Sequence, residues 1–264
     1  MNTYILILLA FFLTVSLSAQ EKDYSGDFDK NNDSKAEPKK AEEAKTVESD
    51  KKDVPPAAKT ESEKKSEPAT PGLSDDEALE ELTKAIRIGN SDRTDAILTA
   101  YPKILNKKDK FGNTPLYNAI FAEQYLVVEI LLKRKADIKL ANVNGDAPIH
   151  RAAQTGNVKI IELLLKSGAA VWTANAKGES PLAKAASSGQ LEAVKFLLQN
   201  KAEINTPDSK GDTPLHKAAL KGEKEIARYL IDKGADLNIK NKEGQKPADL
   251  AKKHEIKELF SGGK

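Results

Sequence analysis

The three histidines are the first side chains to consider for catalytic or metal-binding chemistry. His150 and His216 occupy the same position in two units of a 33-residue repeat, with one unit between them. If each unit adds the ~8–10 Å that separates packed helices, the two rings lie roughly 20 Å apart, too far to share a metal ion. His254 stands alone near the C-terminus. We therefore predict that the histidines are structural and that the chain holds no metal.

Other catalytic chemistry lacks its usual sequence patterns. The absence of cysteine excludes a thiol nucleophile, a thiolate metal site and a disulfide. We find no glycine-rich phosphate loop, nucleophile elbow or metalloprotease motif, and no serine in a catalytic context. Residues 29–33 have oxygen ligands at the first, third and fifth positions of an EF-hand-like calcium loop. Ser34 replaces the glycine of that loop and Lys40 replaces its bidentate glutamate, so we expect no calcium site. The chain is predicted to be non-catalytic and to bind no cofactor.

The composition limits the fold and the partners. Charged residues make up 31% of the chain, hydrophobic residues 39% and aromatic residues only 5%. That apolar content is thin for one thick core but adequate for a stack of small layers. A net charge of +2 argues against duplex nucleic acid as a partner.

Prolines recur at a constant step of 33 residues, each three positions after a glycine and four before an alanine. These prolines are Pro115, Pro148, Pro181, Pro214 and Pro247. Self-similarity at one fixed period is the signature of a repeat array. The repeat must therefore position whatever functional residues the chain has.

Each unit is predicted to be a helix–turn–helix followed by an extended loop or β-hairpin. In residues 142–174, Pro148 suits the first position of a short helix, and Gly156 ends that helix. Apolar residues between positions 158 and 165 give a second helix a broad apolar face. One unit cannot cover these faces alone, so neighbouring units stack. We predict an all-α repeat solenoid.

The unit at residues 208–240 resembles the ankyrin repeat. The resemblance is carried by TPLHKAA at residues 213–219, Gly222, and LIDKGADLN at residues 230–238. Over residues 73–264 we expect an atypical first unit (73–108), repeats at 109–141, 142–174, 175–207 and 208–240, and a C-terminal cap (241–264). The resemblance implies a scaffold that binds another protein through the concave face formed by the loop tips and inner helices. It also implies that the motif histidine hydrogen-bonds the loop.

The N-terminal third differs in composition. Residues 4–15 are nearly all apolar and are followed by Ser16, Ser18 and Ala19, a pattern typical of a signal peptide (1–19) cleaved after Ala19. An uncleaved anchor is the alternative, although the run is shorter than the ~20 residues that span a bilayer. Residues 20–72, rich in Lys, Glu, Pro and Ala, are expected to form a disordered linker. Export to the bacterial periplasm or beyond the cell follows from this interpretation.

Four positions depart from the repeat pattern. Glu123 replaces the glycine between the helices of the first full unit, and Lys135 and Lys201 replace the glycine after the outer helix. If these three keep a left-handed backbone, each costs ~1 kcal/mol. Ala147 stands where other units have an N-capping Thr or Ser, so its helix should begin less favourably by up to ~1 kcal/mol.

The family resemblance, carried over unit by unit, assigns the candidate protein-binding residues to the concave face. They are Lys110, Phe111, Asn113, Tyr117, Phe121, Val143, Asn144, Asp146, Arg151, Gln154, Trp172, Lys177, Glu179, Lys184, Lys210, Asp212, Lys217, Leu220 and Lys221. Two groups stand out among them, an aromatic set and a basic row.

The aromatic set comprises Phe111, Tyr117, Phe121 and, one unit later, Trp172. Exposed aromatic residues are common interface anchors, and the alternative is that they pack over neighbouring loops. Sequence alone leaves both open.

The basic row comprises Arg151, Lys184 and Lys217, which recur at one position of the repeat. The row either faces an acidic partner surface or consists of ordinary solvated cations. Both interpretations stay open at this stage.

The function predicted from sequence is an exported, non-catalytic scaffold that binds a protein through the concave face. One alternative is a membrane-tethered envelope scaffold with an uncleaved anchor, and another is an unrecognised hydrolase. No nucleic acid and no small-molecule substrate is expected. Contact with a membrane is expected only if the apolar N-terminal segment is retained.

Overall fold

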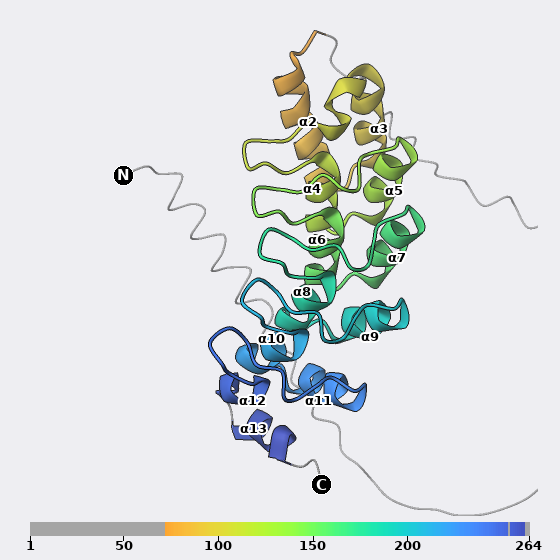
Figure 1. The fold of residues 1–264 in the computed structure, drawn as a ribbon. Coiled ribbons are helices and arrows are strands. Elements are labelled where there is room, and N and C mark those ends of the chain that lie inside the picture. The colour runs from red at the N-terminus through yellow and green to blue at the C-terminus, as the bar shows by residue number, and fades with distance from the viewer. Residues whose placement is uncertain (1–71, 253, 262–264) are drawn as a thin grey trace, which may run out of the picture. The chain divides into compact units, whose positions relative to one another are not determined.

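The computed structural model describes residues 72–252 and 254–261, which form a stack of helix pairs (Figure 1). The predicted signal peptide and nearly all of the predicted linker lie outside these residues. Within the described part every regular element is helical and no strand is present.

The helices form two columns that run side by side along the array (Figure 1). The inner column contains α2 (Asp75–Arg87), α4 (Pro115–Phe121), α6 (Pro148–Thr155), α8 (Pro181–Ser187), α10 (Pro214–Lys221) and α12 (Pro247–Leu250). The outer elements are α3 (Ser91–Ala100), the 3₁₀ helix η1 (Pro102–Asn106), α5 (Tyr125–Lys133), α7 (Val158–Lys166), α9 (Leu191–Gln199), α11 (Lys224–Asp232) and α13 (His254–Ser261). Each inner helix contacts the next inner helix, so the core is continuous along the column.

Proline and a preceding hydroxyl residue start the inner helices. Thr114 and Ser180 accept hydrogen bonds from backbone N–H groups three residues later, at 3.2 Å in both cases. Ala147 has no side chain that can do this, as predicted. There the His150 ring Nδ1 accepts the Ala147 N–H at 3.1 Å, which satisfies another donor at the helix start.

Small residues set the spacing of the inner column. Ala119, Ala152, Ala185 and Ala218 recur at the repeat step and are fully buried. A methyl side chain lets neighbouring short helices approach closely, while Leu and Ile residues of the outer column fill the layer between the two columns. The stack therefore buries apolar faces that a single unit would leave in water.

The loops are closed by an Asp or Asn side chain and form no hairpin strands, in contrast to the β-hairpin alternative. In the loop of α10, Asp208 Oδ1 accepts the N–H groups of Lys210 and Asp212 at 2.8 and 2.9 Å. The Asp208 N–H donates to the Asp212 carbonyl at 3.0 Å. Asp109, Asn142, Asn175 and Asn241 make the same side-chain turns in their units. A turn satisfied within itself leaves few backbone groups for strand pairing.

Neighbouring loop tips are joined by backbone hydrogen bonds toward the C-terminus. The Ser209 N–H donates to the Lys177 carbonyl at 2.9 Å, and the Lys242 N–H donates to the Lys210 carbonyl at 2.8 Å. Glycine permits this close approach, because a Cβ on Gly178 would lie 2.8 Å from the backbone nitrogen of Ser209.

The predicted left-handed positions are confirmed. Glu123, Lys135 and Lys201 have φ angles of 54°, 67° and 66°. Gly168 and Gly234 fill the Lys135 position in other units, with φ angles of 94° and 87°. The array therefore tolerates a strained non-glycine residue where its own pattern supplies glycine.

Lys135→Gly and Lys201→Gly are each expected to raise the free energy of unfolding by about 0.5–1 kcal/mol, because glycine adopts this backbone without steric cost. The greater freedom of glycine in the unfolded chain offsets part of the gain. Urea denaturation of each variant measures the effect. Lys133→Gly, at the end of α5, is the matched control and should lower stability by up to ~1 kcal/mol. A loss of stability at both positions 135 and 201 would contradict the strain argument.

Candidate protein-binding surface

The fourth residue of each full inner helix forms a row along the array. The row contains Asn118, Arg151, Lys184 and Lys217, so its three cations are the basic row of the sequence. A side chain at this position leaves its helix toward the loops and can reach both its own loop and the loop of the preceding unit.

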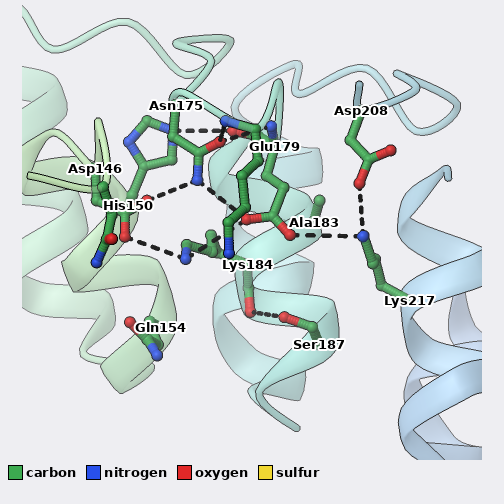
Figure 2. Close-up of polar contacts among 12 residues, drawn as sticks. Asp146, His150, Gln154, Asn175, Glu179, Ala183, Lys184, Ser187, Asp208 and Lys217 are labelled. Atoms are coloured by element: carbon green, nitrogen blue, oxygen red, sulfur yellow. Dashed lines mark hydrogen bonds and ion pairs between the residues drawn. The ribbon is translucent and has the colours of Figure 1, made fainter. Parts of the chain in front are cut away.

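Lys184 bridges two units. Its Nζ lies 3.2 Å from Asp146 Oδ2 in the preceding unit and 3.6 Å from Glu179 Oε2 in its own (Figure 2). Asn175 Nδ2 donates to Asp146 Oδ1 at 2.7 Å and to Glu179 Oε2 at 3.0 Å. The two carboxylates are thus held by one ammonium group and one amide.

Lys217 repeats this arrangement one unit later. Its Nζ lies 2.6 Å from Asp208 Oδ2, 3.3 Å from Asp212 Oδ2 and 3.5 Å from Glu179 Oε1. Asn241 Nδ2 donates to Asp212 Oδ1 at 2.9 Å. We refer to the connected set Asp146, Asn175, Glu179, Lys184, Asp208, Asp212, Lys217 and Asn241 as the charge ladder.

The ladder is largely removed from solvent, which strengthens its interactions. The side chains of Lys217 and Asp208 are only 13% and 3% exposed. Burial alone lowers the pKa of Lys217, but its hydrogen bond and charge interaction with Asp208 and the charge of Asp212 outweigh burial and raise that pKa. Burial likewise raises the pKa of Asp208, and bonds from Lys217 and from the backbone N–H groups of Asp212 and Lys210 reverse the direction and leave it lowered.

The prediction for the basic row needs correction at two positions. Lys184 and Lys217 form neither an open cationic surface nor a set of freely solvated cations. Only 17% and 13% of their side-chain surfaces are exposed, and both ammonium groups lie against carboxylates of this chain. Asp146 and Asp212, which we placed on the exposed loop surface, are buried as the partners of these lysines. The lysines and their carboxylate partners recur at the same step of 33 residues, and comparing the cations alone does not reveal this pairing.

The motif histidines hydrogen-bond the loops, as the resemblance implied. The Nε2 atoms of His150 and His216 lie 3.1 Å from the carbonyl oxygens of Glu179 and Gln245, each in the next unit. Each Nδ1 accepts a backbone N–H, from Ala147 or Thr213. This pattern requires a neutral ring protonated on Nε2, and it leaves neither nitrogen for proton transfer.

Acid should destabilise the array through His150. Burial lowers the pKa of this ring from its ordinary value of 6.5, which the unfolded chain regains. Below pH 6.5 the unfolded state therefore binds more protons, so the free energy of unfolding falls as the pH falls, by up to about 1.4 kcal/mol per pH unit. Urea unfolding from about pH 7.5 to about pH 5 measures this slope. His150→Gln should reduce the slope. An equal slope in the wild-type and His150→Gln proteins would contradict the assignment.

Arg151 differs from the two lysines of its row. Its guanidinium carbon lies 4.2 Å from the ring centroid of Phe121 and 5.4 Å from that of Tyr117, both in the preceding unit. Nη1 donates to Gln154 Oε1 at 3.0 Å. Within the part of the chain that the structure describes, Arg151 pairs with no carboxylate, and its buried Nε has no acceptor.

Tyr117 follows the packing alternative that the sequence left open for the aromatic set. It is buried, and its hydroxyl oxygen accepts a hydrogen bond from Asn142 Nδ2 at 3.0 Å. Burial raises its pKa. Tyr117 occupies the motif position of His150 and His216, which explains why it packs into the loop as they do.

The other predicted residues divide by exposure. The exposed ones are Lys110, Phe111, Phe121, Val143, Asn144, Trp172, Lys177, Lys210, Leu220 and Lys221. Asn113, Gln154 and Glu179 are half-buried, and Glu179 belongs to the charge ladder. Whether any of these residues contacts a partner stays a prediction.

Exposed apolar residues gather in the N-terminal part of the array. Six of the eight large hydrophobic side chains exposed in the described chain lie between residues 88 and 143. They are Ile88, Phe111, Phe121, Tyr125, Leu126 and Val143. Sequence reasoning missed Ile88, Tyr125 and Leu126. A usable signal existed for Leu126, since later units place Lys159, Glu192 and Glu225 at its position.

The described residues contain no group of three or more histidine, aspartate or glutamate side chains arranged to hold a metal ion. None of the helices described is both long and apolar enough to cross a bilayer.

The repeat seen in the sequence and in the stacked helices also appears in a family comparison. A family model described as "Ankyrin repeats (3 copies)" matches residues 82–175 and, in a second overlapping match, residues 149–241. The chain belongs to the ankyrin-repeat family. No curated protein matches it.

Ankyrin repeats generally mediate protein–protein interaction, so the array is a candidate interaction scaffold. The predicted ankyrin fold and its all-helical architecture are confirmed.

Proposed function

We propose that this ankyrin array is a non-catalytic scaffold whose protein partner binds the N-terminal half of its concave face. The observation that carries the proposal is the exposure of Phe111, Phe121 and Val143, which lie on the loop tips and the inner helix of the first two full units. Monomeric proteins seldom leave several large apolar side chains together in water without an interaction role.

Comparison of units supports this location. Phe111 at the first loop tip corresponds to Asn144, Lys177 and Lys210 in later units, and these are polar. The exposed fractions of Phe111 and Phe121 are 64% and 59%, so most of each ring is available to a partner. Aromatic side chains placed this way are frequent hot spots because they bury a large area at low entropy cost.

Site-specific photo-cross-linking tests the proposal. A benzophenone side chain at position 121, on the proposed surface, should cross-link one discrete partner in the native cell envelope. The same side chain at position 225, an exposed site on the outer helix α11, is the matched control and should give no such product. Equal labelling from both positions, or from position 225 alone, would rule out the proposed face.

The hydrolase alternative has less support. His216, the residue on which it most depends, uses both ring nitrogens to hold backbone groups, so it has no free lone pair for general-base catalysis. A broad hydrolase screen of the wild-type chain and of His216→Ala distinguishes the two functions. A hydrolase activity of the wild-type chain that disappears in a folded His216→Ala protein would support the enzymatic function.

We further propose that the protein is exported, with cleavage after Ala19. The apolar run of residues 4–15 and the small residues that follow it support this proposal. Intact-mass measurement of the chain from its native cell would show the loss of residues 1–19. A retained N-terminus would favour a membrane-tethered scaffold instead.

A further inference from the structure

Arg151 occupies the row position of Lys184 and Lys217 one unit earlier, but it does not belong to the charge ladder. Lys184 reaches back to Asp146 at 3.2 Å, and Lys217 reaches back to Glu179 at 3.5 Å. The corresponding position before Arg151 is Asn113, which carries no charge. The repeat thus supplies a cation at Arg151 without the carboxylate that its two successors have in the preceding unit.

Asp109, the carboxylate in the loop of the preceding unit, already accepts three hydrogen bonds. Asp109 Oδ1 accepts the N–H groups of Phe111 and Asn113 at 2.8 and 2.9 Å, and its Oδ2 accepts Asn118 Nδ2 at 2.8 Å. Asn118 is the member of the row that precedes Arg151. Asp146, the acid of the unit that holds Arg151, is bound by Lys184 and Asn175 instead. Arg151 therefore pairs with neither neighbouring acid, and its guanidinium stacks on the exposed ring of Phe121.

We propose that the protein partner supplies the missing carboxylate, as an Asp or Glu side chain of an extended segment that also carries an aromatic residue. This inference rests on the proposed function. The carboxylate pairs with the guanidinium edge of Arg151, and the neighbouring aromatic side chain packs on Phe121 and Phe111.

Three features of Arg151 favour this ligand over other anions. Its planar guanidinium is stacked on one aromatic ring and near a second, so its edges are left for the forked pairing that fits a carboxylate. Within the described chain the only acceptor of its guanidinium is Gln154 Oε1, which Nη1 contacts, so the fold leaves guanidinium donors that a partner acceptor can satisfy. The exposed Lys110, over the ring of Phe111 at 5.3 Å, adds positive charge beside the apolar surface.

Nuclear magnetic resonance of the ¹⁵N-labelled full chain tests this inference. The probe is a capped peptide of sequence Gly-Asp-Phe-Asp-Gly, and its isosteric control is Gly-Asn-Phe-Asn-Gly. The acidic peptide should shift the Arg151 Nε–Hε signal saturably at millimolar concentration, and the amide peptide should bind at least about ten-fold more weakly.

Variants separate Arg151 from general electrostatics. Arg151→Met should abolish the preference for the acidic peptide, and Arg151→Lys, which keeps the charge without the fork, should weaken binding about five-fold. Lys159→Met removes an exposed cation of the outer helix α7 in the same unit as Arg151 and should change nothing. Dispersed amide spectra establish that each variant is folded.

Several outcomes would overturn the inference. They are equal affinity for the two peptides, the absence of any saturable shift, a preference that survives Arg151→Met, or an equal response to inorganic phosphate, which would indicate a general anion site. If cross-linking from position 121 still captures the partner in any of these cases, the proposed binding function stands and only the carboxylate assignment fails.

Discussion

Lys217→Met is expected to lower the free energy of unfolding of the array by about 3–4 kcal/mol, because removing one partner of a buried ion pair leaves the other charge uncompensated. In the wild-type protein, Lys217 Nζ lies within 2.6 to 3.5 Å of carboxylate oxygens of Asp208, Asp212 and Glu179. Without the ammonium group these three carboxylates repel one another in a poorly solvated site. Chemical denaturation near neutral pH measures the loss.

A double variant tests the cause of this loss. Asn stands at the position of Asp208 in three other units and makes the same loop turn, so Asp208→Asn keeps the backbone acceptor while it removes a charge. Lys217→Met combined with Asp208→Asn should therefore be more stable than Lys217→Met alone, by about 1 kcal/mol or more. Lys84→Met, which breaks an exposed ion pair with Glu81, is the control and should leave the stability almost unchanged. A double variant no more stable than Lys217→Met would show that packing, and not charge, sets the cost.

Phe111→Ala combined with Phe121→Ala is expected to weaken partner binding about 100- to 1,000-fold, since each hot-spot ring typically contributes about 2 kcal/mol. Both rings are mostly exposed, so the fold should survive. The stability cost expected is the loss of the ring contacts of Phe121 with Arg151 and of Phe111 with Lys110, about 0.5–1 kcal/mol.

Capture of the cross-linked partner and the helical circular dichroism signal are the two measurements. Leu220→Ala is the matched control, because Leu220 is the exposed apolar residue at the Phe121 position three units later. It should leave capture intact. If the double variant captures the partner as well as the wild type does, the binding face lies elsewhere.

The fold was predictable because local and global signals agree. Pro148 predicts a helix start, Gly156 its end, and Ala152 a close inner contact, and each recurs at the same step. Even the departures were predictable: a lysine at position 135 or 201 cannot change the chain path that its neighbouring units impose, so it takes the left-handed backbone.

The candidate site was predictable only in part, because its side chains are paired across units. Lys184 looked free when it was compared only with Arg151 and Lys217, and its partner Asp146 looked like an exposed loop residue. Carboxylates at positions 146, 179 and 212 recur at the same step as the lysines, so the pairing had a signal in the sequence. The packing of Tyr117 also had a signal in the sequence, since its motif position is that of the buried His150 and His216.

Lys184 and Lys217 each contact a carboxylate of the preceding unit, so the order of the units matters. This order constrains how the array can gain or lose units. Removing residues 175–207 would bring Lys217 against Asp146, and an acid would still face it in the preceding unit. Removing residues 142–174 would bring Lys184 against Asn113, with no acid there. Recombination between units, the usual way in which repeat genes change length, is therefore not neutral here: deletion of one unit preserves the pairing across the new junction, and deletion of its neighbour destroys it.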